Sequence, residues 1–162
     1  MSIAETIKQS YQLSDQVVQA YLNDLSDDEL KIRAVAGMNN INWQVGHIIV
    51  SEHQIAEMLC PGSMPPLPEG MAEIYDRANV DKDDLPFYTK ERLFELKEEQ
   101  RAGTIAAIDK LSDEELMKPS PEKLKMLGGT IGAIFLMLGS HWTMHAGQWV
   151  AVRRLTGKEV KI

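Results

Sequence analysis

Two histidines near the C-terminal end of the chain, His141 and His145, have a type and spacing suited to chemistry. They are four positions apart, so on a helix both rings leave the same face and converge on one point. Two buried imidazoles that face one another are unfavourable unless something binds them, and neutral imidazole is a ligand for Zn, Ni, Fe or Cu. The alternative is that one histidine is a hydrogen-bonded core residue and the other lies at the surface.

The residues between the two histidines exclude one class of metal enzyme. A zincin metalloprotease has a glutamate directly after the first histidine of its helix, whereas Trp142, Thr143 and Met144 stand between the histidines here. Structural zinc sites usually have four ligands, often cysteines, while catalytic sites have three and leave one position open. A third ligand must therefore come from elsewhere in the chain.

Two other histidines, His47 and His53, are candidates for the third ligand. Both fall in one predicted helix, about 120° apart around its axis, so only one of them can point into a shared site. His47 belongs to a second apolar face of that helix, with Trp43 and Val50. Both His47 and His53 are expected at a height along the bundle close to that of His141 and His145. The apolar periodicity of the helix does not choose between them either.

Four stretches of helical periodicity must position these residues. Asn39 or Asn40 is a possible cap for the second stretch, and Pro61-Gly62 stops it. Thr89 is a plausible cap for the third. Thr156-Gly157 ends the fourth, which opens after Gly128-Gly129. The predicted helices cover about residues 3–25, 41–59, 89–111 and 130–155.

The connection between the second and third helices is unusually long, at roughly 29 residues, for a segment without structure of its own. Its simplest role is to carry the chain along the bundle, so that the helices on either side run parallel. The sequence Leu25–Leu30, LSDDEL, recurs as LSDEEL in Leu111–Leu116, each time between two helices. Either the chain is two related helix pairs in an up-down-down-up four-helix bundle, or Ser-Asp-x-Glu is only a common capping sequence.

Composition indicates one globular domain covering residues 1–162, with 44% apolar and 25% charged residues. The net charge of −7 opposes binding to nucleic acid. No apolar run is long enough for a membrane span, and the N-terminus has no signal-peptide pattern. Cys60 is the single cysteine, which excludes an intramolecular disulfide and suits a cytoplasmic protein.

These motifs resemble the DinB/YfiT-like superfamily of metal-binding four-helix bundles. The resemblance rests on WQVGHIIVSEH in Trp43–His53, on HWTMHAGQ in His141–Gln148, and on RRLTG in residues 153–157. It covers essentially the whole chain and implies the up-down-down-up topology, with a long crossover between helices two and three. It also implies a homodimer, and a divalent metal, with Zn or Ni expected, bound by His47, His141 and His145. By the same resemblance, His53 is a neighbouring or surface residue.

Superfamily members with known activity include thiol-dependent S-transferases, which implies a low-molecular-weight thiol as cosubstrate beside a small-molecule electrophile. The expected function is therefore a metal-dependent thiol S-transferase or a related hydrolase. Gln148 and Trp43 are candidates for orienting a ligand or substrate, although solvation explains Gln148 equally well and packing is the better explanation for Trp43. The alternatives are a non-catalytic, metal-binding dimeric stress-response module and a metal-free helical protein whose histidines fill the core.

Overall fold

The computed structural model describes residues 1–161, which contain seven α-helices, two short 3-10 helices and no strand. This confirms the predicted all-α class. No helix within these residues has the length and apolarity to cross a membrane. The long helices are α1 (Ile3–Leu22), α3 (Ile41–Leu59), α5 (Lys90–Ile108) and α7 (Ile131–Leu155); the short ones are α2 (Asp27–Leu30), α4 (Met71–Ile74), η1 (Arg77–Asn79), α6 (Asp113–Leu116) and η2 (Glu122–Leu124).

Side-chain caps fix where the long helices begin. Asn40 accepts a hydrogen bond from the Trp43 amide at the start of α3, and Thr89 and Thr130 cap α5 and α7 in the same way. α1 and α5 each end three residues before the predicted position. Both predictions overshot because apolar periodicity continues through Leu25 and Leu111, which instead form turns back onto Leu22 and Ile108.

The repeated LSD(D/E)EL sequences have the same structure in both places. Ser26 and Ser112 each cap a one-turn helix, and the carboxylate of the glutamate three residues later accepts a hydrogen bond from the serine backbone N–H. These reciprocal capping boxes satisfy amide groups that would otherwise lack partners. The repeated sequences therefore form capped one-turn connections between long helices.

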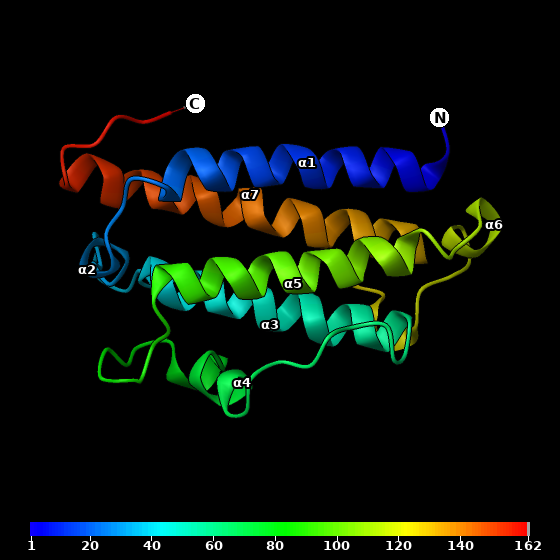
Figure 1. Ribbon diagram of the computed structural model, residues 1–162, viewed down its shortest axis with the longest axis horizontal. Coiled ribbons are helices and arrows are strands. Elements are labelled where there is room, and N and C mark those ends of the chain that lie inside the picture. Colours follow the sequence, from blue (N-terminus) through cyan, green and yellow to red (C-terminus); the bar gives the residue numbers. More distant parts are fainter. Residues whose placement is uncertain (162) are drawn as a thin grey trace.

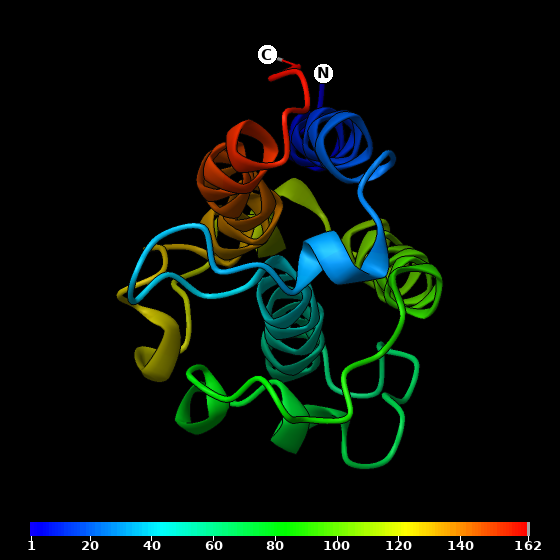
Figure 2. The same ribbon diagram turned by 90° about the vertical axis from the view of Figure 1, so that its left-hand side faces the viewer.

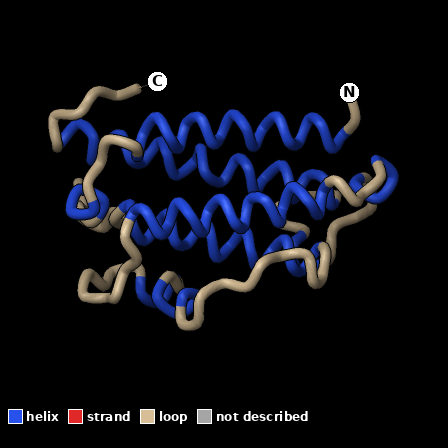
Figure 3. Tube along the Cα trace, in the orientation of Figure 1, coloured by secondary structure: helices blue, strands red, loops and turns tan. Residues whose placement is uncertain are grey.

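The four long helices lie side by side as a bundle (Figures 1 and 3). In Figure 1, α1 and α7 run from right to left, whereas α3 and α5 run from left to right. α1 packs along α7, and α3 packs against both α5 and α7. The long segment between α3 and α5 returns the chain along the bundle, passing through α4 on the outer side of α3 (Figure 2).

This arrangement buries α3 on two sides. One glycine permits the close approach of the α4 segment: a Cβ atom on Gly46 would lie 2.2 Å from the ring of Tyr75. The Tyr75 hydroxyl donates to the Asn42 side chain on α3 and accepts from the amide of Tyr88. These contacts fix the crossover segment against the part of α3 that carries His47.

The bundle interior has two apolar clusters with a charged layer between them. In this layer Glu52 accepts hydrogen bonds from the Arg101 guanidinium and from the Trp142 indole N–H. Asp15 lies 3.2 Å from Arg101 and 2.8 Å from Lys97. Since the side chains of Glu52, Lys97 and Arg101 are at most 5% exposed, each needs its partners, and the layer fixes how α1, α3, α5 and α7 align.

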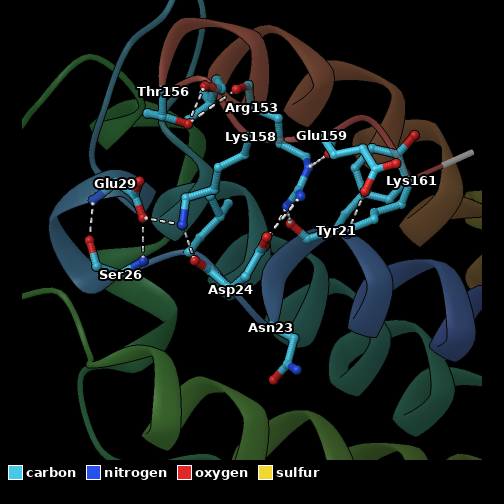
Figure 4. A network of polar contacts seen from close by, with 12 residues as sticks. Tyr21, Asn23, Asp24, Ser26, Glu29, Arg153, Thr156, Lys158, Glu159 and Lys161 are labelled. Carbon is cyan, nitrogen blue, oxygen red and sulfur yellow. Dashed lines mark hydrogen bonds and ion pairs between the residues drawn. The ribbon is translucent and has the colours of Figure 1, made fainter.

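A second polar network closes the end of the bundle where α1 and α7 terminate (Figure 4). The fully buried Arg153 donates to both carboxylate oxygens of Asp24 and to the carbonyl of Tyr21. Lys158 donates to the Asp24 carbonyl and lies 3.3 Å from Glu29. The hydrogen bonds from Arg153 lower the pKa of the Asp24 carboxyl to about 2. The network therefore stays charged and joins α7 to α1 and α2.

Candidate metal centre

Three histidine rings from two helices come together between α3 and α7. The ring centroids of His141 and His145 are 4.9 Å apart. The centroid of His47 lies 5.8 Å from that of His141 and 6.3 Å from that of His145. The structure therefore brings together the three residues predicted as ligands.

The proton on His145 can be placed from its hydrogen-bond partners. Its Nδ1 atom lies 3.0 Å from Oε1 of Gln44, and the same oxygen lies 3.0 Å from the indole nitrogen of Trp149. An indole N–H only donates, so this Gln44 atom is an acceptor and Nδ1 of His145 must carry the proton. Nε2 of neutral His145 then has a free lone pair, which is the tautomer that a metal ion requires.

The two α7 histidines have the separation of ligands to one ion. Their Nε2 atoms are 3.2 Å apart. Two nitrogens bound to a tetrahedral Zn²⁺ at about 2.0–2.1 Å lie about 3.3 Å from each other. Because Nε2 of His145 is unprotonated, the two atoms share one hydrogen bond in the metal-free state, with His141 as donor. The donor set of this pair therefore fits a divalent metal.

His47 lies slightly too far from the pair to complete a formed site. Three imidazoles on one tetrahedral ion have ring centroids about 5 Å apart, which is shorter than both distances from His47. The ring of His47 instead stacks on Trp43, with centroids 4.7 Å apart and planes 8° apart. In line with this, no three His, Cys, Asp or Glu side chains within residues 1–161 have the geometry of a formed metal site.

Burial keeps the three imidazoles neutral. It lowers the pKa of His141 to about 4, with further lowering from the charges of His145, His47 and Arg77. It also lowers the pKa of His145 to about 4, against an opposing hydrogen bond with Gln148. The pKa of His47 falls for the same reason, with Arg77 again adding to the effect. At neutral pH all three rings are therefore neutral, and each keeps one nitrogen lone pair; on His141 the proton must move from Nε2 to Nδ1 before Nε2 can bind an ion.

A cavity of about 410 Å³ opens directly beside the histidines. The connection before α3 and the segment around η1 form its other walls. Trp43, predicted as a ligand-orienting or substrate-binding candidate, lines it, whereas Gln148 is exposed on α7 and is not among the lining residues. The lining residues are Gly37, Asn39, Trp43, His47, Arg77, Val80, Asp81, His141 and His145.

His53 lies apart from this group. Its Nδ1 atom is 3.0 Å from Oε1 of Gln100 on α5, and Nε2 of Gln100 donates to the carbonyl of Pro65. The side chain is thus used in joining α3, α5 and the crossover segment. This contact gives His53 a role in packing between these elements.

Sequence reasoning missed two residues of the site, Gln44 and Arg77. A signal existed for Gln44, because it is a polar residue within a stretch that is apolar on two faces of α3, and it is fully buried. No sequence signal marked Arg77. It lies in the crossover segment, which long-range contacts such as the packing of Tyr75 on Gly46 and the hydrogen bond from Trp43 to Asp76 bring to the histidines.

The comparison with known proteins gives a family but no closer relative. No match was found among functionally curated proteins. The sequence profile of the DinB superfamily matches residues 11–149, a range that begins within α1 and includes all three clustered histidines and most of α7. Proteins of this superfamily generally bind metal ions. The chain belongs to the DinB superfamily.

Proposed function

We propose that this protein is a divalent-metal-dependent enzyme in which His47, His141 and His145 bind one ion, with Zn²⁺ or Ni²⁺ expected. The observation that carries the proposal is the fixed tautomer of His145, because Gln44 prepares its Nε2 atom 3.2 Å from that of His141. A hydrogen bond that orients a histidine in this way is typical of metal ligands.

The reaction that this arrangement supports best is transfer of a thiol sulfur to an electrophile. A divalent ion with an open position supplies a Lewis acid, at which a bound thiol loses its proton at neutral pH. Neutral ligands leave the charge of the ion uncompensated, so the three imidazoles favour an anionic fourth ligand. The cavity has the volume of a small-molecule site, and Trp43 shields one side of the histidines from water. A hydrolase with bound water is the nearest variant.

We further propose that residues 1–162 act as one domain and that the protein is a homodimer. Several large apolar side chains are exposed on α1 and α7, including Leu13 at 61%, Leu136 at 42% and Met144 at 60%. Exposed apolar surface of this kind is typical of a contact between proteins when it is contiguous. Sedimentation of wild type and Leu136→Lys tests this: a monomeric wild type contradicts the dimer.

Metal binding is tested first, on protein purified without a histidine tag. Elemental analysis and titration with Zn²⁺ should give one ion per chain in wild type and a large loss of affinity in His145→Ala. His53→Ala is the matched control, because His53 is on α3 but outside the cluster. Equal metal content in the two variants would refute the three-histidine site.

Catalysis is tested on the same proteins by conjugation of 1-chloro-2,4-dinitrobenzene with a panel of low-molecular-weight thiols. Metal-loaded wild type and His53→Ala should be active, whereas His145→Ala should fall to the uncatalysed rate. Metal binding without any conjugation or hydrolysis would instead support the non-catalytic metal-binding module.

A further inference from the structure

Arg77 occupies a distinctive place beside the histidine cluster. It is the first residue of η1, and it lines both the 410 Å³ cavity and a second cavity of about 310 Å³. His47 is part of both walls. Arg77 and the three clustered histidines therefore face the same cavity.

The backbone around Arg77 is held in place from both sides. The Asp76 carbonyl accepts a hydrogen bond from the indole N–H of Trp43 at 3.3 Å. Arg33 donates to the carbonyls of Val80 and Met38 and to the carboxylate of Asp83. Arg33 thereby joins the two loops that form the outer walls of the cavity, so the position from which Arg77 extends is well defined.

The side chain of Arg77, by contrast, has no partner. Within residues 1–161 its guanidinium makes no hydrogen bond or ion pair. It is the only Lys or Arg among the described residues that line the larger cavity, and Asp81 is the only carboxylate there. Arg33, by comparison, donates to Val80, Met38 and Asp83. A guanidinium that is anchored at its backbone and unpaired at its tip is suited to bind an anion from solution.

We propose that Arg77 is a specificity-determining residue that binds a carboxylate of the thiol cosubstrate whose sulfur occupies the open metal position. This inference rests on the proposed function and deepens it. A monoanionic carboxylate matches the planar guanidinium in two hydrogen bonds. A dianionic phosphate matches less well, because one arginine would balance half its charge while Asp81 lines the same cavity.

The test uses full-length protein loaded with Co²⁺, which reports thiolate binding through sulfur-to-cobalt absorption and needs no turnover. Two thiols of similar length are titrated: 3-mercaptopropionate, which has a carboxylate, and 3-mercaptopropan-1-ol, which is neutral. Wild type should prefer the carboxylate thiol by about fivefold, the size expected for a partly exposed ion pair. The preference should weaken on addition of salt.

Four variants separate the charge of Arg77 from other effects. Arg77→Gln should bind the two thiols equally, and Arg77→Lys should keep part of the preference. Asp81→Asn should increase it, because a repulsive carboxylate is removed. Arg92→Gln on α5 is the matched control, since Arg92 is a partly exposed arginine that pairs with Glu95 and Glu99 and does not line the cavity. It should behave as wild type.

The outcomes distinguish this inference from the proposed function. Equal affinities in wild type, or a preference that survives in Arg77→Gln, overturn the role of Arg77 while leaving a metal-dependent thiol site intact. A cobalt spectrum that neither thiol changes overturns the thiol proposal, and the role of Arg77 with it. Loss of the preference in Arg77→Gln, together with its increase in Asp81→Asn, supports the inference.

Discussion

Replacement of Gln44 by leucine tests the central link between fold and chemistry. Gln44 is fully buried. Its Oε1 atom accepts hydrogen bonds from His145 and Trp149, and its Nε2 atom donates to the Asn39 carbonyl at 2.8 Å. Leucine has a similar volume but none of these groups, so Gln44→Leu removes the hydrogen bonds and changes the packing little.

The expected cost follows from which partners can reach water. Trp149 is fully buried, so an indole N–H without a partner there should lower the free energy of unfolding by about 1–3 kcal/mol. His145 and the Asn39 carbonyl are only partly buried and recover part of their hydrogen bonding from solvent. The total loss in the free energy of unfolding should be about 2–4 kcal/mol. Affinity for Zn²⁺ should fall about 10- to 100-fold, because the His145 ring is no longer oriented.

Urea denaturation of the metal-free protein measures the first quantity, and competition with a chromophoric chelator measures the second. Gln44→Glu is the control for metal affinity alone, because it keeps an acceptor for His145 and Trp149 but loses the donor to the Asn39 carbonyl. It should bind Zn²⁺ at least as tightly as wild type. If Gln44→Leu binds the ion as tightly as wild type, Gln44 does not orient a ligand, and the argument from the His145 tautomer fails.

Three other predictions concern the metal-free protein. Burial lowers the pKa values of His141 and His145 to about 4, so as pH falls below about 6.5 the unfolded chain takes up protons at these residues before the folded protein does. The free energy of unfolding should therefore fall as pH drops from about 6.5 to 4. A flat pH profile in urea denaturation would show that the two rings are not buried as described. Glu52→Gln should cost about 3 kcal/mol in the same assay, because buried Arg101 loses its main carboxylate; a loss below 0.5 kcal/mol, as expected of a surface change, refutes this. Gly46→Ala should cost about 1–3 kcal/mol and expose the crossover segment to proteolysis, because the new methyl group meets an aromatic ring; wild-type resistance contradicts it.

The helices were predictable because their signals are local. Asn40 and Thr89 cap α3 and α5 through contacts within four residues, and such contacts can be recognised in the sequence. The ends of α1 and α5 were placed wrongly for a related reason. Leu25 and Leu111 continue the apolar pattern, but the serine after each of them caps a new one-turn helix. The long helix therefore ends before the leucine.

The candidate site was predictable only in part. The spacing of His141 and His145 on one helix is local information, whereas the third member came from the family resemblance, because His47 and His53 fit the helix pattern equally well. The structure shows the physical difference between them: Gln100 on α5 engages His53. Arg77 could not be predicted, since its place depends on a long-range contact between the crossover segment and α3.

The closing of the site on a metal ion is best understood as movement of one side chain. Hydrogen bonds between α7 and α3 lie on both sides of His47, since the Trp149 indole donates to Gln44 and the Trp142 indole donates to Glu52. The spacing of the helices is therefore fixed. The shift of about 1 Å that His47 needs must then come from rotation of its ring off Trp43, at a cost of about 0.5–1.5 kcal/mol. Structural Zn²⁺ sites release about 10 kcal/mol or more, so the ion outweighs this cost. Binding should change the side-chain resonances of Trp43 and leave those of Trp142 and Trp149 in place; a shift of all three would mean that the helices move instead.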